Sequence, residues 1–239
     1  ISFASKKDIA VSQSGAIPNH NGNEGRFIIY ASSDNVKTQA STIPLKLLPT
    51  VKNPQKGYLF SANQKPVNQT YQYNLYGYYA LYRNRILDDK LSEKSKFSPS
   101  DFMKLQLSNY DLLAKEALPV MIKCIDKSLL TPAEKELFEK LSIWDYNDNH
   151  DAIEPILFYS WWGNFYGECW DELNEYPVLK PNYETTLRLL EKESNNIYFD
   201  NKSTPETETG KDALLKSLKL VLGRYLKTEK KHGKTNWGT

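Results

Sequence analysis

Two short segments set the fold class of this chain. Residues 98–101 (Ser-Pro-Ser-Asp) and residues 131–134 (Thr-Pro-Ala-Glu) each place a hydroxyl residue, then proline, then an acidic residue two positions further on. At a helix N-terminus, the hydroxyl accepts a hydrogen bond from an unpaired backbone N–H, and the fixed φ of proline suits the first helical position. Both segments therefore predict helix starts, and the chain is expected to be helical after residue 97.

The helical part is expected to contain several amphipathic helices. From residue 98, apolar and amide side chains recur at spacings of three and four as far as Leu113, and Pro119 should kink or end that helix. Periodicity predicts further helices over the ranges 131–141, 152–173, 183–193 and 212–226. The polar stretch 201–210 is predicted to be a solvated loop.

Residues 1–97 follow a different pattern. Short apolar runs, such as residues 9–11 and 27–30, alternate with clusters of Gly, Asn and Pro. This spacing is typical of strands, and residues 7–8 are short enough for a hairpin turn. The sequence therefore predicts an α+β chain, with a strand- and loop-rich part over 1–97 and a mainly helical region over 98–239.

The composition argues against several functional classes. A net charge of +2, with 40% hydrophobic and 25% charged residues, is typical of a folded globular chain and provides no excess charge for nucleic acid. The sequence contains no run of 18 apolar residues, so it predicts no membrane-spanning helix. Cys124 and Cys169 lie in helical patterns and are predicted to be buried thiols, while three scattered histidines make no local transition-metal site.

Two clusters resemble functional sites, and both are interpreted as structural. Asp145 and Asp148 beside Trp144 suggest a carboxylate pair of the kind used on sugars, but they fall in an expected loop between helices. A tyrosine cluster is open to two interpretations, a stacking platform or simple packing, and packing is favoured. Its members are Tyr71, Tyr73, Tyr76, Tyr78, Tyr79 and Tyr82. The aromatic residues at helical spacing over 161–170 are predicted to be core.

An ordered series of segments resembles one known family. Residues 43–66 resemble the stretch in the large chain of penicillin acylases that leads through NPP.G to ANN.P and the oxyanion-hole asparagine. Residues 3–18 resemble that family's hairpin ending in G.IP, and residues 82–86 resemble its YRA.RI. Segments at 98–106 and 141–145 follow in the order of the family's helical region, so the resemblance covers nearly the whole chain.

This resemblance implies an amide hydrolase. Penicillin acylases, or penicillin amidases, are N-terminal nucleophile hydrolases with an αββα fold, in which a freed serine or cysteine attacks an amide carbonyl. Asn63 matches the asparagine that donates its side-chain N–H to the oxyanion of the tetrahedral intermediate. Arg83 matches the arginine that the family places near the active site, and Arg85 lies within one small gap of the same register.

The nucleophile itself has no counterpart here. Ile1 has no nucleophilic side chain, and Ser2 is followed by Phe3 and Ala4, unlike the family's nucleophile. The chain is therefore expected to be an internal segment of the large chain, supplying oxyanion-hole and scaffold residues and inactive by itself.

The same resemblance sets the expected ligands and partners. No cofactor is required for catalysis; structural calcium belongs to the full-length family, and only Asn74 lies near a ligand position. The expected partners are an N-acyl small molecule and the remaining segments of the parent hydrolase, with no nucleic acid or membrane. Penicillins, acyl-homoserine lactones and other N-acyl compounds all remain open as substrates, and the implied compartment is periplasmic or extracellular.

Two alternative functions stay open at this point. One is a non-catalytic binding or interaction module, with an aromatic surface for sugar or protein. The other is a family member that has lost catalysis.

Overall fold

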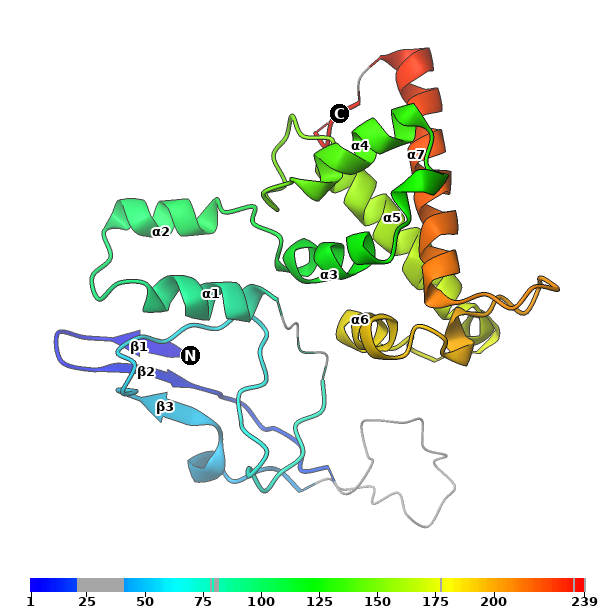
Figure 1. Cartoon of the computed structure of the whole chain (residues 1–239). Coiled ribbons are helices and arrows are strands. Elements are labelled where there is room, and N and C mark those ends of the chain that lie inside the picture. Colours follow the sequence, from blue (N-terminus) through cyan, green and yellow to red (C-terminus); the bar gives the residue numbers. More distant parts are fainter. Residues whose placement is uncertain (21–40, 78, 80–81, 177, 234, 239) are drawn as a thin grey trace, which may run out of the picture. The chain divides into compact units, whose positions relative to one another are not determined.

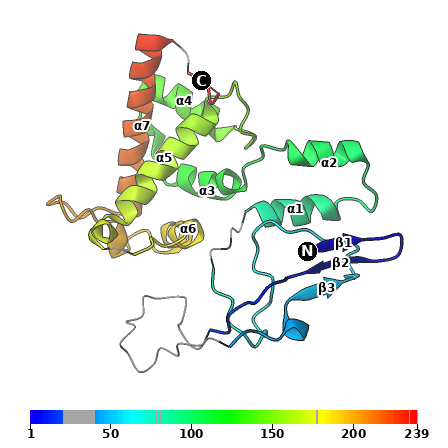
Figure 2. The same ribbon diagram turned by 180° about the vertical axis from the view of Figure 1, so that it is seen from behind.

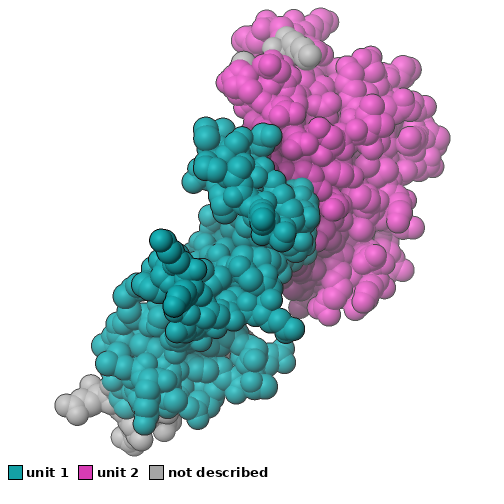
Figure 3. Space-filling model, turned by 90° about the vertical axis from the view of Figure 1, so that its left-hand side faces the viewer, with its two compact units in different colours: residues 1–107 teal, residues 108–239 magenta. Residues whose placement is uncertain are grey.

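The computed structural model describes residues 1–20, 41–77, 79, 82–176, 178–233 and 235–238. The chain divides into two compact units, residues 1–107 and residues 108–239, which Figure 3 colours separately. The boundary between the units falls after residue 107, whereas the pattern of the sequence changes at residue 97. The first unit contains a small sheet and two helices, and the second is built from helices (Figure 1).

A three-stranded antiparallel sheet forms from the described residues of the first unit. Its strands, in spatial order, are β1 (Ser2–Ala4), β2 (Ile9–Ser12) and β3 (Thr50–Lys52). Strands β1 and β2 form the predicted hairpin, with Phe3 opposite Ala10. Ser5 Oγ accepts hydrogen bonds from the backbone N–H groups of Lys7 (3.2 Å) and Asp8 (3.0 Å), so the turn forms without glycine. The predicted strand at 27–30 lies outside the described residues.

A small apolar core supports the loops of the first unit. Ile43, Leu48 and Leu75 are buried in it, beside the short 3₁₀ helix η1 (Leu45–Leu47). Tyr71 and Tyr73 pack against this core, and the Tyr71 hydroxyl donates to the backbone oxygen of Leu47 at 2.9 Å. These two tyrosines therefore serve packing, as predicted; Tyr78 lies outside the described residues.

Helix α1 (Arg83–Ser92) lies within the part that the sequence predicts to be rich in strands and loops, and the sequence patterns did not predict this helix. Its inward side is narrow, because Leu91 is buried and Leu87, one turn earlier, is only half-buried. Such a short apolar stripe among charged residues gives a weak helical pattern. Helix α2 (Pro99–Gln106) begins at the predicted start, where Ser98 and Asp101 form a capping box.

The predicted helix from residue 98 to beyond Leu113 is wrong, because it consists of two helices. Helix α2 ends at Gln106, and the chain then pairs with a distant loop: the Asp111 N–H donates to the Tyr146 oxygen at 2.7 Å. The Asp111 side chain caps a new helix, α3 (Leu112–Lys123), by accepting from the Ala114 N–H at 3.0 Å. Helix α3 continues through Pro119 to Lys123, so this proline does not end it.

The second unit is formed by helices at the positions that the sequence predicts. After α3 they are α4 (Pro132–Ser142), α5 (Glu154–Cys169), α6 (Tyr183–Lys192) and α7 (Gly210–His232). Short 3₁₀ helices connect them: η2 (Lys127–Leu129), η3 (Asp171–Glu175) and η4 (Ile197–Phe199). The α-helix predicted to reach residue 173 ends at Cys169, where Trp170 takes a non-helical ψ of 35°. The predicted polar stretch 201–210 forms the loop between η4 and α7, except that its last residue, Gly210, begins α7.

Helices α5 and α7 lie side by side in this unit (Figures 1 and 2). Trp161 and Phe165 of α5 are fully buried, and the Trp161 ring N–H donates to the backbone oxygen of Leu214 at 3.0 Å. The predicted aromatic core is thus confirmed. Cys169 is a buried free thiol as expected, and Cys124 is half-buried.

The α+β fold class is confirmed, with helices dominating. Among the described residues, every helix is too short or too polar to cross a membrane.

Candidate functional site

The segment over residues 53–66 starts from a fixed point on the sheet. Asn53 follows β3 with a φ of 46°, and its Oδ1 accepts from the Ile9 N–H at 2.9 Å. Its Nδ2 donates to Asp8 Oδ1 at 2.7 Å, and this bond, aided by Lys52, lowers the pKa of the Asp8 carboxyl. One side chain therefore holds the segment to the end of the first hairpin.

A second anchor ties the same segment to α1. Gly57 closes a turn with a φ of 77°, which a residue without Cβ adopts readily, and its N–H donates to the Pro54 oxygen at 2.9 Å. The turn presents Lys56 and Tyr58 to Asp88 of α1, at 2.7 Å and 2.9 Å from Oδ1. Hydrogen bonds from Lys56 and then Tyr58 lower the pKa of Asp88. The segment is therefore held at the helix as well as at the sheet.

Asn63 lies beyond these anchors with its side chain exposed and its backbone in the left-handed region, at a φ of 61°. Arg83 Nη2 donates to Asn63 Oδ1 at 2.6 Å. Because arginine has donors and no acceptor, the end of the amide that faces it must be the oxygen. The two N–H donors of Asn63 are therefore turned away from the guanidinium.

The structure distinguishes the two arginines of the family-like segment. Arg83 is the first residue of α1, and this position brings its guanidinium to Asn63. The guanidinium carbon of Arg85 lies instead 5.1 Å from the centre of the Tyr82 ring. The two residues predicted from the sequence, Asn63 and Arg83, thus lie together although they are 20 residues apart.

Gln64 is a third member of this site, and the sequence patterns did not point to it. Its Oε1 accepts from the Ala62 N–H at 2.6 Å, and its Nε2 donates to the Phe60 oxygen at 3.0 Å. The sequence offers one signal, since Gln64 directly follows Asn63 in the segment that resembles ANN.P.

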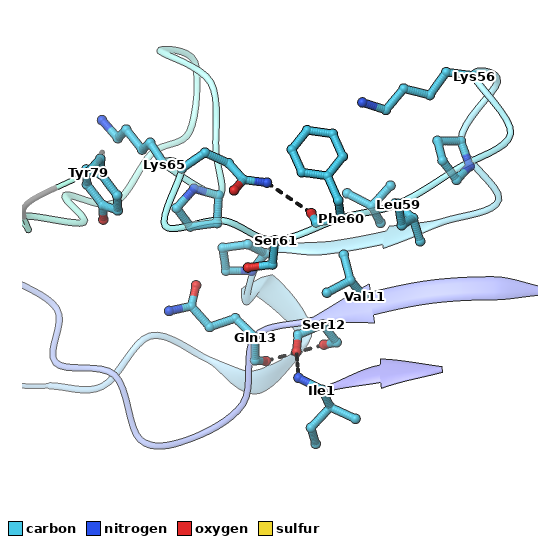
Figure 4. A pocket seen from close by; sticks show the side chains of 15 residues that line it. Ile1, Val11, Ser12, Gln13, Lys56, Leu59, Phe60, Ser61, Lys65 and Tyr79 are labelled. Carbon is cyan, nitrogen blue, oxygen red and sulfur yellow. Dashed lines mark hydrogen bonds between the residues drawn. The ribbon is translucent and has the colours of Figure 1, made fainter. Parts of the chain in front are cut away.

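A cavity of about 500 Å³ lies between the sheet and this segment (Figure 4). From the segment, Phe60, Ser61, Gln64 and Lys65 line it, so residues on both sides of Asn63 reach the cavity wall. Residues from β2 and β3 form the opposite side, and Val11 and Ser12 of β2 are seen there in Figure 4. The described lining residues include neither Asn63 nor Arg83.

The carboxylates considered from the sequence separate in the structure. Asp145 Oδ1 accepts from the Asn147 N–H at 3.0 Å within its own loop. Asp148 instead approaches Tyr159 of α5, whose hydroxyl lies 3.4 Å from Oδ2, and the carboxylate of Asp111. Burial, followed by the charge of Asp111, raises the pKa of Asp148 to about 6, and burial also raises the pKa of Tyr159.

Metal ligation stays an expectation for the parent protein. Within the described part of the chain, no three side chains of His, Cys, Asp and Glu come together as a metal-binding group. Asn74, the residue nearest to a family calcium position, is exposed and forms an isolated β-bridge with His20.

Two comparisons relate this chain to known proteins. A family model described as penicillin amidase matches residues 1–239. The fold is similar to that of a thermostable penicillin G acylase from Alcaligenes faecalis in orthorhombic form, with a TM-score of 0.67 and 14% sequence identity. The match covers 97% of this chain and 46% of that chain, so this chain spans less than half of the length of the acylase chain. Because the family model matches the whole of it, the chain belongs to the penicillin amidase family.

Proposed function

We propose that this chain is the part of a hydrolase for N-acyl amides that stabilises the tetrahedral intermediate, and that Asn63 is the donor. The observation that carries this proposal is the 2.6 Å hydrogen bond from Arg83 to Asn63 Oδ1. It turns the two N–H donors of an exposed amide away from the helix. A donor held in one direction before the reaction is what an oxyanion hole requires.

In the proposed reaction, a nucleophile from another segment of the parent protein attacks the amide carbon of the substrate. The carbonyl π electrons move to oxygen, and the resulting O⁻ accepts a hydrogen bond from Asn63 Nδ2. Arg83 acts through Asn63, because a cationic donor on Oδ1 polarises the amide and makes its N–H groups stronger donors. The negative charge develops only during the reaction, so this interaction favours the transition state over the substrate.

The substrate is proposed only as a class. An acyl amide provides the carbonyl oxygen that becomes the oxyanion. The cavity lined by Phe60, Ser61 and Gln64, which flank Asn63 in the sequence, has room for a small apolar group. Residues that would select among N-acyl compounds belong to the remaining segments of the parent.

The test uses the full-length parent enzyme with Asn63→Ala and Asn63→Asp. Both variants are expected to fold and self-process, and both should lower kcat by roughly 10²-fold to 10³-fold, the usual effect of losing one oxyanion donor. Asn63→Asp keeps the size and an oxygen for Arg83 but has no N–H, so it separates donation from packing. Turnover equal to that of the unmodified enzyme in both variants would contradict the proposed role.

A separate measurement addresses the alternative of a binding module. Oligosaccharides are titrated into this chain while tryptophan fluorescence is followed. The hydrolase proposal expects no saturable change, because Tyr71 and Tyr73 pack on the core of the first unit. A saturable change at low concentration would favour the binding module.

A further inference from the structure

The amide of Gln64 makes two hydrogen bonds to the backbone just before Asn63. Its Nε2 donates to the Phe60 oxygen at 3.0 Å, and its Oε1 accepts from the Ala62 N–H at 2.6 Å. Both ends of one planar group are therefore used, one as donor and one as acceptor. This arrangement fixes residues 60–62 relative to Gln64 and so holds the chain on both sides of Asn63.

The backbone that this amide holds is conformationally unusual. Asn63 has a φ of 61°, in the left-handed region that L residues other than glycine seldom occupy, although asparagine tolerates it better than most. Such a conformation persists when the surrounding structure determines it. The described contacts that do so are the Gln64 amide and the burial of Ala62, whose side chain is 8% exposed.

Asn63 is consequently held at two ends. Arg83 holds the oxygen of its side chain, and Gln64 holds the backbone from which the side chain projects. The direction of the Nδ2 donors depends on both constraints, because rotation of the backbone at residue 63 would swing the whole side chain even with Arg83 in place.

We infer that Gln64 is a positioning residue for oxyanion stabilisation, acting through Asn63. This inference rests on the proposed function of Asn63. An oxyanion donor must lie about 2.7–3.1 Å from the place where the charge develops, and small misplacements are costly in rate. Both ends of the Gln64 amide are hydrogen-bonded to the backbone, so Gln64 supplies that placement without hydrogen-bonding the substrate, and its loss should lower kcat more than it changes KM.

The experiment measures kcat and KM separately in the full-length parent enzyme. Gln64→Met keeps the length of the side chain and removes both hydrogen bonds. It should lower kcat by roughly tenfold to 10²-fold, with KM within about twofold. Asn68→Ala is the control, because Asn68 also accepts hydrogen bonds through its side chain within its own loop, from the Thr70 N–H at 3.1 Å and the Thr70 hydroxyl. Its kcat should stay within about twofold of the unmodified value.

The double variant Asn63→Ala/Gln64→Met tests whether Gln64 acts through Asn63. Because the asparagine is already absent, the second change should lower kcat by no more than about twofold further. If Gln64→Met slows the Asn63→Ala enzyme as much as it slows the unmodified enzyme, Gln64 has a general structural role and the inference is overturned. It is also overturned if Gln64→Met has normal kcat while Asn63→Ala is slow. A normal kcat in Asn63→Ala contradicts the proposed function and therefore also the inference.

Gln64→Glu keeps the test decisive if Gln64→Met fails to fold or self-process. The carboxylate retains the acceptor for the Ala62 N–H and loses the donor to the Phe60 oxygen, which returns when the acid is protonated. The kcat of Gln64→Glu relative to the unmodified enzyme should therefore rise as the pH falls towards about 4, near the ordinary pKa of glutamate. A pH-independent ratio of one overturns the inference.

Discussion

One hydrogen bond decides which end of the Asn63 amide faces outward. Arg83 can only donate, so the amide oxygen is turned towards it and the N–H groups are turned away. Arg83 is thus the hydrogen-bond donor to the Asn63 oxygen, whereas Arg85 lies over the Tyr82 ring.

Replacement of Arg83 should affect turnover much more than replacement of Arg85. In the full-length parent, Arg83→Met is expected to lower kcat by roughly tenfold, because the Asn63 amide loses its charged partner and its fixed orientation. Arg85→Met is the matched control and should stay within about twofold. Steady-state kinetics checks both variants, and equal losses would show that the two arginines are interchangeable supports.

Asp148 should make the second unit less stable as the pH rises from about 4 to about 6. Its pKa is raised from the ordinary value of 3.8 to about 6 in the folded chain, so the folded state binds this proton more tightly than the unfolded state. The contribution of this proton to the stability of the folded state is fully present below both pKa values, and it is lost as the pH rises through the higher one. Asp111 and the Tyr159 hydroxyl face this carboxyl.

Asp148→Asn is the direct test, because it removes the charge and keeps the shape. The difference in unfolding free energy, variant minus unmodified, should increase between about pH 4 and pH 6, as measured by urea unfolding at several pH values. Asp145→Asn is the control, since the carboxylate of Asp145 accepts its hydrogen bond from Asn147 within the same loop. A difference that is flat with pH would show that Asp148 titrates normally.

At the scale of elements, one glycine of α7 and one of α5 differ in the space around them. Gly210 begins α7, and a Cβ there would lie 3.0 Å from Leu190 Cδ1 and 3.1 Å from Phe199 Cδ2. Both neighbours are buried, at 2% and 3% exposure, and have little room to move. Gly163 of α5, by contrast, is exposed, and a Cβ there would meet nothing within 4 Å.

The same substitution at these two glycines should have opposite effects. Gly210→Ala is expected to destabilise the unit by about 1–3 kcal/mol, because the added methyl group overpacks the start of α7. Gly163→Ala should stabilise it by about 0.5–1 kcal/mol, because alanine loses less backbone entropy in a helix. Urea unfolding followed by far-UV circular dichroism checks both. Stabilisation by Gly210→Ala would mean that Leu190 and Phe199 can yield.

At the scale of the whole molecule, the two units differ in how much apolar surface they bury. Buried aromatic and aliphatic side chains fill the second unit, whereas Ile43, Leu48 and Leu75 form the small core of the first. The first unit also has a sheet whose outer strands, β1 and β3, are exposed. Such edges and such a small core are marginal for independent folding.

Residues 108–239 expressed alone should therefore fold cooperatively, and residues 1–107 alone should not. Thermal unfolding by circular dichroism is expected to show one sharp transition for the second unit and none for the first, with the 1–239 chain as the reference. A sharp transition in residues 1–107 would show that the sheet and its loops need no further partner.

The parts of the structure that the sequence predicted depend on hydrogen bonds between near neighbours. In the capping boxes at Ser98 and Thr131, the second partner is the residue three positions later. Four consecutive residues are therefore enough to predict the start of α2, and four others the start of α4. The order of the family-like segments along the chain indicates the penicillin amidase family, and the whole-chain match confirms it.

Tertiary contacts decided the rest. The chain breaks between α2 and α3 because the Asp111 N–H pairs with Tyr146, and Asp148 meets Asp111 instead of its sequence neighbour Asp145. Arg83, the first residue of α1, reaches Asn63, whereas Arg85 lies over the Tyr82 ring. The sequence alone determined the local helix starts and the family. The geometry of the site depends on chain segments that meet only after folding, because residues so far apart along the chain leave no local pattern.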